Sequence, residues 1–422
     1  MRVRLSDECY RRSIDLLRNS AGPAGFVASP AFEHYAAVWT RDAAVACLAA
    51  YRARDSDLVA AAARTLETLA ERQGPFGQVP DAVWPERAYW DWGEAGAVDA
   101  SAWFIIIAAE HFTATGDTEF ARRLWPHANR AMIWLTHLDT TNTRLIDSPP
   151  AGDWMDSSLV RSGRVFHVNV LYHWAAQSLS TFASGVSEAS PVDAADLAWR
   201  INILFWPEPA ARYEDLLAHV AYPPGNDAAF AHDALPAALA AAAVGGRHHY
   251  LSHVMQAALV DRCDVLANLL AIVSGLANNR RAERILDFLD AVGVAAPFPS
   301  KSWPEPVTAD DDPWAMWNRA AEAAIPARWR NPPHHYHNAA VWPYIGGFHI
   351  AALAATGRRQ KASELLERLA AANRVGDWSF HEWLHGETGD PGGAPAQTWN
   401  AGSFVLASHH TREGLRFAID QT

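Results

Sequence analysis

The segment Val168-Asn-Val-Leu-Tyr-His-Trp-Ala-Ala176 is rich in small and apolar side chains on every side of the helix that its pattern predicts. A helix that is apolar all round is buried in the interior of a protein. Five other segments have the same character: Ala43–Ala50, Ser101–Ala109, Val265–Val273, Val341–Ile350 and Ala401–Ala407. The helical segments between them carry more charge, as in Arg358–Arg368. This alternation predicts six inner helices surrounded by six outer ones, which is the all-α arrangement called an (α/α)6 toroid or six-hairpin barrel.

Twelve helical segments are expected in all, with boundaries uncertain by roughly 2–4 residues. They are 7–19, 41–54, 57–71, 100–115, 119–135, 168–182, 193–205, 262–276, 280–292, 341–356, 360–372 and 399–411. Their connections alternate between a few residues and several tens, and short links join antiparallel neighbours. All long links are therefore expected at one end, where they form a funnel with the N-termini of the inner helices. A stacked solenoid is the alternative, but no fixed repeat length is found, which favours the closed ring.

The chain is interpreted as a single domain spanning residues 1–422, because no segment has the composition of a linker. The Ala-rich segment Ala237–Val244 is expected to be a short helix, begun by Pro236 and ended by Gly245. The long loops at 217–261 and 298–338 carry no recognisable motif.

The composition disfavours several classes of protein. Lys and Arg number 35 against 47 Asp and Glu, a formal charge of −12, whereas a nucleic-acid-binding protein usually presents a basic face. No apolar run is long enough to cross a membrane, and the first residues lack the apolar core of a secretion signal. Cys9, Cys47 and Cys263 have no paired spacing, which indicates reduced thiols. A cytoplasmic protein without nucleic-acid or membrane partners is expected, and the sequence carries no indication of its oligomeric state.

Each long loop ends at an inner helix with a short polar signature, and in five of six cases a tryptophan lies beside it. The signatures are Trp39–Asp42, Asp91–Glu94 with Val98–Trp103, Gly152–Ser157, Asp264–Asn268, Tyr336–Pro343, and Phe380–Trp383 with Gln397–Trp399. One interpretation is that these polar residues cap helices, as Thr40, Asp99 and Thr398 are suited to do. Capping does not require the tryptophans. A sugar-binding cleft does use them, because aromatic rings stack on C–H faces while acids and arginine take the hydroxyl groups.

Two carboxyl groups are candidates for catalysis. Asp156 lies in Gly152-Asp-Trp-Met-Asp-Ser157, where apolar neighbours would bury it and raise its pKa, as a general acid near neutral pH requires. Glu382 lies between His381 and Trp383, before the last inner helix, although a solvated loop acid is the alternative interpretation. The two acids belong to the third and sixth helix starts, so they are expected to face each other across the funnel. This arrangement favours inverting hydrolysis, with the carboxyl groups roughly 6.5–9.5 Å apart to admit water.

These motifs resemble two families of glycoside hydrolase. Asp91–Glu94, Val98–Ile106, Tyr336–Pro343 and Gln397–Gly402 resemble the neutral/alkaline invertases, whereas Gly152–Ser157 is similar to the glucosidase domain of glycogen debranching enzymes. The resemblance extends from Trp39 to Leu406 and implies an inverting hydrolase on a six-hairpin toroid. It implies Asp156 as the general acid and Glu382 as the general base, with a pocket that includes Asp42, Trp103, Asn338, Trp342 and Trp399. With the signatures above, the predicted substrate-binding residues are Trp39, Arg41, Asp42, Trp92, Asp99, Trp103, Trp154, His337, Asn338, Trp342, Gln397 and Trp399.

The substrate stays open, because Ser157-Ser-Leu159 replaces the basic residues of the invertases and the extra domains of the debranching enzymes are absent. The expected reaction is hydrolysis of an α-glucosidic-type bond in a small oligosaccharide or glucoside, sucrose-like or derived from an α-glucan, without a cofactor. The alternative is a sugar epimerase or isomerase of similar fold that uses histidines, such as those at 334–337, 248–249 and 409–410. A phosphorylase and a non-catalytic sugar-binding protein are further alternatives. A catalytic metal is not expected, because these histidines lack the spacing of metal ligands.

Overall fold

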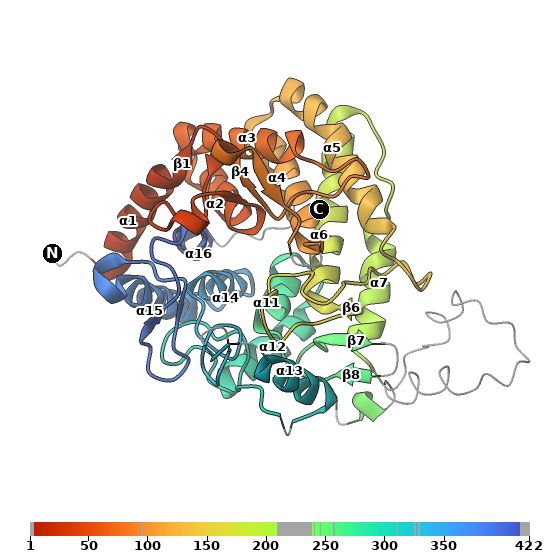
Figure 1. Cartoon of the computed structure of the whole chain (residues 1–422), viewed down its shortest axis with the longest axis vertical. Coiled ribbons are helices and arrows are strands. Elements are labelled where there is room, and N and C mark those ends of the chain that lie inside the picture. The colour runs from red at the N-terminus through yellow and green to blue at the C-terminus, as the bar shows by residue number, and fades with distance from the viewer. Residues whose placement is uncertain are drawn as a thin grey trace, which may run out of the picture.

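The computed structural model describes residues 4–93, 96–208, 239, 241–244, 246–255, 258–309, 311–324, 326–327 and 330–413. Within these residues an inner ring is formed by α2 (Thr40–Ala53), α4 (Val98–Thr115), α6 (Phe166–Val186), α11 (Val265–Val273), α14 (Pro343–Ala355) and α16 (Thr398–Glu413). Each helix packs against the next in this order, and α16 packs against α2, so the ring closes. Figure 1 shows these helices arranged around a common centre.

A second set of helices packs outside this ring. Its members are α1 (Leu5–Ser20), α3 (Ser56–Glu71), α5 (Thr118–Thr136), α7 (Ala194–Phe205), α12 (Asn279–Ala291) and α15 (Arg359–Trp378). Five of them follow an inner helix directly and pack on it, whereas α1 packs on α16, so that the two ends of the described chain form the sixth hairpin. The predicted (α/α)6 toroid is confirmed.

Small residues allow the inner helices to approach one another closely. A Cβ atom added to Gly347 of α14 would lie 2.5 Å from the Cβ of Ser403 in α16. One added to Gly402 of α16 would lie 2.9 Å from the carbonyl oxygen of Val45 in α2. Larger side chains at these two positions would push neighbouring inner helices apart, which explains why the sequence is so rich in glycine and alanine here.

The short links turn the chain from an inner helix to an outer one. Arg54 ends α2 in the left-handed conformation (φ 54°), and the Asp55 carboxylate then accepts hydrogen bonds from the first N–H groups of α3. Gly116 and Asp117 form the same arrangement between α4 and α5. Because links of this kind make each hairpin antiparallel, the long links return to the opposite end.

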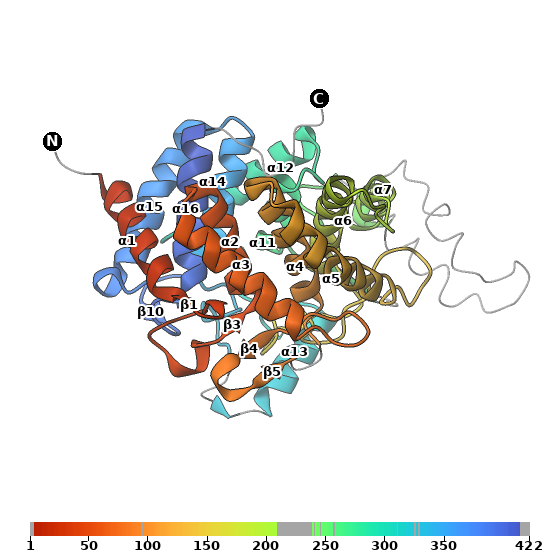
Figure 2. The ribbon, with the colours of Figure 1, turned by 90° about the horizontal axis from the view of Figure 1, so that it is seen from above.

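The long links contain short strands at the end where the inner helices begin, which is the lower edge of the molecule in Figure 2. Two antiparallel three-stranded sheets lie there: β3 (Val38–Trp39), β4 (Ala82–Trp84) and β5 (Tyr89–Asp91), and β6 (Arg164–Val165), β7 (His253–Met255) and β8 (Ala258–Val260). Val38 pairs with Val83, and Arg164 pairs with Val254. Two-stranded ribbons are formed by β1 (Ala21–Gly22) with β2 (Gly25–Phe26) and by β9 (Trp383–Leu384) with β10 (Pro391–Gly392). The sequence did not predict them, because strands of two or three residues are too short to show alternation.

The remaining elements of the long links are η1 (Glu33–Tyr35), η2 (Pro85–Arg87) and the helix α13 (Pro313–Ala323), none of which was predicted. Of the predicted helix Ala237–Val244, Leu239 and residues 241–243 are helical and Val244 is in a turn, while the other positions lie outside the described residues. Much of the loop at 217–261 also lies outside them. None of the helices in the described part of the chain is long and apolar enough to span a membrane.

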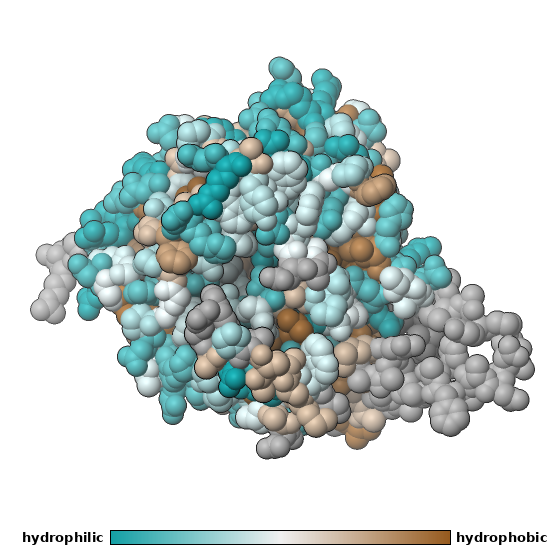
Figure 3. Space-filling view, in the orientation of Figure 1, coloured by the Kyte–Doolittle hydropathy of each residue, from teal (hydrophilic) through white to brown (hydrophobic). Residues whose placement is uncertain are grey.

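The described surface of the molecule is mostly hydrophilic and its interior is apolar, as expected when charged outer helices surround apolar inner ones. On the face drawn in Figure 3, hydrophilic residues cover most of the described surface, and hydrophobic ones form small separate patches. Met316 and Trp317 of α13 are two of the large apolar side chains that remain exposed. Most of the apolar side chains of the inner helices are buried instead, so the core of the molecule lies within and between the two rings.

Candidate active site

Arg41, in the first turn of α2, gathers carboxylates from three different parts of the chain. It contacts Asp81 at 2.9 Å, Asp99 at 3.1 Å and Asp156 at 3.1 Å. The side chains of Arg41, Asp81 and Asp99 are almost completely buried, whereas that of Asp156 is 30% exposed. Asp156 is therefore the member of this cluster that an incoming molecule can reach.

One cation does not neutralise three carboxylates, and their pKa values differ accordingly. Burial raises the pKa of Asp156 to about 7, against the charge of Arg41 and with the help of the negative charges on Asp81 and Asp99. Burial opposes the ionisation of Asp99 too, but Arg41 and His167 together hold its pKa below the usual value. The pKa of Asp81 is raised by burial to about 6. Asp156 is thus the carboxyl of the three that most readily keeps its proton.

Glu382 is buried in a different environment, in the loop that leads to β9. The hydroxyl group of Tyr35 donates to its Oε1 at 3.1 Å, and the N–H of Ala394 donates to its Oε2 at 3.0 Å. Burial raises the pKa of Glu382 to about 7, while these two hydrogen bonds oppose the shift by favouring the carboxylate. The loop passes so close that Gly393, at φ 69°, has no room for a Cβ atom beside the carboxylate.

The fold brings Asp156 and Glu382 to one site. Burial raises the pKa of the phenol groups of Tyr35 and Tyr336, and the negative charges of both acids raise each pKa further. Asp42 lies close enough to Glu382 to be affected by its charge. Burial raises the pKa of Asp42 to about 8, and the negative charge of Glu382 adds to this effect. Carboxyl groups from the first turn of α2 and from the loops before α6 and α16 therefore share one electrostatic environment.

Aromatic rings from several loops pack against one another in this region. Tyr344 and Trp399 stack with centroids 4.1 Å apart, and Trp154 meets Trp342 edge-on at 5.4 Å. Tyr35, which donates to Glu382, contacts Trp39 edge-on at 5.6 Å. Such surfaces suit the C–H faces of a sugar.

The polar contacts at the helix starts correct the capping interpretation. Thr40 donates its hydroxyl to the carbonyl of Pro80, and Asp99 pairs with Arg41 rather than with an N–H group. Thr398 donates to the carbonyl of Val27. None of the three caps its helix, because each lies inside the first turn and contacts another part of the chain.

Sequence comparisons divide the chain between two families. Residues 27–202 match the family described as the bacterial alpha-L-rhamnosidase six-hairpin glycosidase domain, and residues 229–414 match the alkaline and neutral invertases. The chain is a six-hairpin glycosidase. The expected resemblance to neutral/alkaline invertases is confirmed for its second half, and both matches describe hydrolases of glycosidic bonds. No curated protein sequence matches the chain.

Solved structures share the fold at low sequence identity. A mannosylglycerate hydrolase of Thermus thermophilus, solved with Tris and D-glycerate, is 16% identical and superposes with a TM-score of 0.64 over 95% of this chain and 100% of its own. An uncharacterized conserved protein of the same organism is 15% identical, with a TM-score of 0.63 over 95% of this chain and 99% of its own. A bacterial glucoamylase complexed with acarbose is 15% identical, with a TM-score of 0.61 over 97% of this chain and 56% of its own.

The described contacts of four predicted substrate-binding residues are with residues other than Asp156 and Glu382. Trp103 packs in the interior against Trp174 and Phe348. The amide of Asn338 is used by the backbone of Val307 and Asn331. Trp92 is half-buried in the loop before α4, with its ring beside Gly74. Gln397 is buried, and its amide nitrogen has no hydrogen-bond partner among the described residues.

Among the described residues, the histidines at 334–337 lie in packing contacts with other rings. His337 packs against Trp154 at 5.1 Å, and burial lowers its pKa to about 3, so the ring is uncharged at neutral pH. The rings of His334 and His335 contact that of His385. In the described part of the chain, no three His, Cys, Asp or Glu side chains are arranged to hold a metal ion. The epimerase interpretation gains no support from these contacts.

Sequence reasoning missed several side chains of the site. Tyr35 donates to Glu382, Asp81 pairs with Arg41, and Tyr336 and Tyr344 help to form the aromatic surface. A buried arginine needs acidic partners, so Arg41 indicated that further carboxylates lie near it. The sequence did not indicate that Asp81 is one of them.

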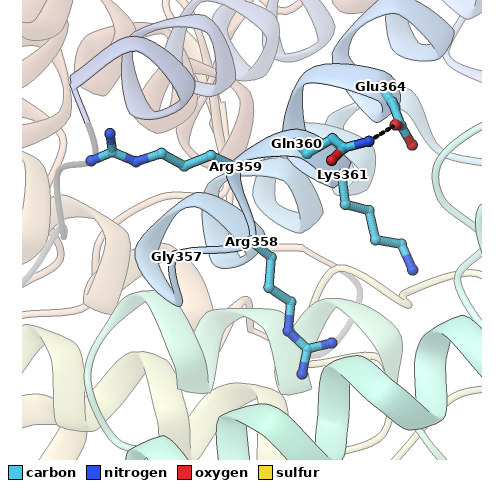
Figure 4. Close-up of a pocket in the computed structure, with 6 residues that line it drawn as sticks. All are labelled: Gly357, Arg358, Arg359, Gln360, Lys361 and Glu364. Atoms are coloured by element: carbon cyan, nitrogen blue, oxygen red, sulfur yellow. Dashed lines mark hydrogen bonds between the residues drawn. The ribbon is translucent and has the colours of Figure 1, made fainter.

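Two hollows of the glycosidase lie away from the acids. Figure 4 shows the first, an open depression at the α14–α15 turn lined by Arg358, Lys361 and neighbouring residues. The second is a crevice of about 340 Å³ between α4, α6 and the start of α7, with Glu110 and His173 in its walls. Neither hollow is lined by Asp156 or Glu382.

Proposed function

We propose that this glycosidase hydrolyses an α-glucosidic-type bond in a small oligosaccharide or glucoside, with inversion, using Asp156 as general acid and Glu382 as general base. The observation that carries the proposal is that two buried carboxyl groups, each with its pKa raised to about 7, have different partners. Asp156 shares the charge of Arg41 with two other carboxylates, which weakens the stabilisation of its ionised form. Glu382 accepts two hydrogen bonds, which favour its ionised form.

The proposed reaction uses Asp156 in its protonated form and Glu382 in its ionised form. Asp156 gives its proton to the glycosidic oxygen, which leaves with the second product. Glu382 takes a proton from a water molecule, whose oxygen attacks the anomeric carbon from the opposite face. The sugar is released with inverted configuration, and proton exchange with solvent returns both acids to their starting states.

The size of the substrate is supported by two features. Trp39, which is partly exposed beside Tyr35, offers an aromatic surface for a sugar unit. The similar mannosylglycerate hydrolase, which aligns over almost the whole of both chains, acts on a small glycoside. We extend the same proposal to the domain organisation: residues 1–422 form one catalytic domain, as the packing of α1 on α16 supports. A cytoplasmic location stays a prediction from the sequence.

The test is hydrolysis of a panel of sucrose, trehalose, maltose, isomaltose, glucosylglycerate, mannosylglycerate and glycogen. We expect Asp156→Asn and Glu382→Gln each to abolish turnover while the thermal midpoint changes little. NMR at early times should show the β-anomer released from an α-glycoside. Initial α-anomer, or full activity of Glu382→Gln, would reject the mechanism, and dependence on added phosphate would indicate a phosphorylase.

A further inference from the structure

A second buried arginine lies beside the loop that carries the proposed acid. The Arg161 side chain is fully buried between Asp153 and Asp264. It holds Asp153 with two hydrogen bonds, from Nε at 3.2 Å and from a terminal nitrogen at 2.6 Å. Its other terminal nitrogen donates to Asp264. No step of the proposed hydrolysis uses this cluster.

Each of the two carboxylates also holds a backbone N–H group. Asp153 accepts from the N–H of Met155 at 2.8 Å, which shapes the turn immediately before Asp156. Asp264 accepts from the N–H of Ala267 at 3.0 Å and so caps α11. Arg161 therefore connects the turn before Asp156 to the N-terminus of the inner helix α11.

Stability alone is a poor explanation for three buried charges. Removing such groups from water costs several kcal/mol each, and apolar replacements of similar volume are often equally stable. What the cluster supplies is position: the carboxylate of Asp156 has one described hydrogen bond, to Arg41, and its side chain is partly exposed. The location of its backbone must come from the neighbouring turn.

We propose that Arg161, held by Asp264, is a positioning residue for the general acid, which keeps the turn at 153–155 fixed on the N-terminus of α11. This inference rests on the proposed role of Asp156. A displacement of about 1 Å at a reacting group can lower the rate of the chemical step about 100-fold. Loosening the cluster should therefore reduce kcat much more than it alters KM.

The most selective variant is Asp264→Asn. Asparagine can still accept the hydrogen bond from Ala267 and cap α11, but it removes the charge that holds Arg161. We expect kcat to fall about 10- to 100-fold with KM within about threefold. Arg161→Lys tests the same cluster by removing the two parallel hydrogen bonds to Asp153.

Arg200→Met is the matched control. Arg200 is also buried and ion-paired, but it lies on the outer helix α7, where it bonds Asp196 at 2.8 Å and the carbonyl of Thr143 at 3.1 Å. This variant should lose stability without a selective loss of kcat. A comparable fall in kcat for Arg200→Met would show that loss of a buried ion pair, and not position, is responsible.

Amide hydrogen exchange of residues 152–160 gives a readout that does not depend on turnover. Exchange should accelerate in Asp264→Asn and not in Arg200→Met. If exchange and kcat are both unchanged in Asp264→Asn, or if exchange rises while kcat does not fall, the positioning role is overturned. If the wild type hydrolyses no glycoside of the panel, the proposed function fails, while the exchange result still shows whether the cluster holds the turn.

Discussion

The hydrogen bond from Tyr35 to Glu382 offers a quantitative test of the proposed base. It joins the phenol oxygen to Oε1 over 3.1 Å, and Glu382 is 5% exposed. Phenylalanine has the same shape without the hydroxyl group, so Tyr35→Phe removes the donor and leaves the packing against Trp39 in place. The ionised form of Glu382 loses a strong hydrogen bond, whereas the protonated form loses a weaker one.

The size of the expected shift in the pKa of Glu382 follows from the usual strength of such a hydrogen bond. A hydrogen bond to a charged group contributes about 1.5–3 kcal/mol, and about 1.4 kcal/mol corresponds to one pH unit. The lower figure is appropriate because Tyr35 is only partly buried. Since Glu382 must be ionised to act, its pKa of about 7 sets the acidic limb of the kcat/KM profile. Tyr35→Phe should move that limb upward by about one pH unit, so that kcat/KM falls about tenfold below pH 6 and is unchanged above pH 9.

The assay is a kcat/KM profile of wild type and variant from pH 4.5 to 10 with the best substrate of the panel. Tyr89→Phe is the control, since its exposed hydroxyl lies 3.4 Å from Asp91. That variant should leave both limbs unchanged. A shift of the alkaline limb alone would assign Glu382 the role of the acid, and no shift in Tyr35→Phe would show that this hydrogen bond does not influence the base.

Two further variants test the surroundings of the acids. Gly393→Ala places a methyl group against the Glu382 carboxylate at a residue with φ 69°, so kcat should fall at least tenfold. Gly357→Ala is the control, because Gly357 has a similar φ of 80° and no atom within 4 Å of the added methyl group. It should lower the free energy of unfolding in urea by only about 1 kcal/mol. Asp42, with its pKa raised from 3.8 to about 8, binds a proton in the folded state that the unfolded chain has released, so wild-type stability should decline between pH 4 and 8. Asp42→Asn should reduce that decline, and identical pH dependence of urea unfolding in the two proteins would contradict the pKa of Asp42.

The overall fold was predictable because its signals are local. Segments such as Val168–Ala176 and Val341–Ile350 have no polar face, which predicts buried helices. Short links such as Arg54–Asp55 can only join antiparallel helices. The small strands around the site were not predictable, because a pair such as Val38 and Val83 is selected by the return of a distant loop. Asp156 and Glu382 were chosen as candidates from their positions in loops that precede inner helices, with apolar neighbours that indicated burial.

The amino-acid sequence by itself determined the ring of hairpins and the end at which the loops gather, and it singled out two candidate acids in those loops. Only the tertiary structure decided their partners: Asp81 and Asp99 share the charge of Arg41 with Asp156, while Tyr35 donates to Glu382. The physical reason is the separation along the sequence of the residues that interact. Helix formation depends on residues a few positions apart, whereas the pKa of a buried carboxyl depends on charges and hydrogen-bond donors brought from anywhere along the chain.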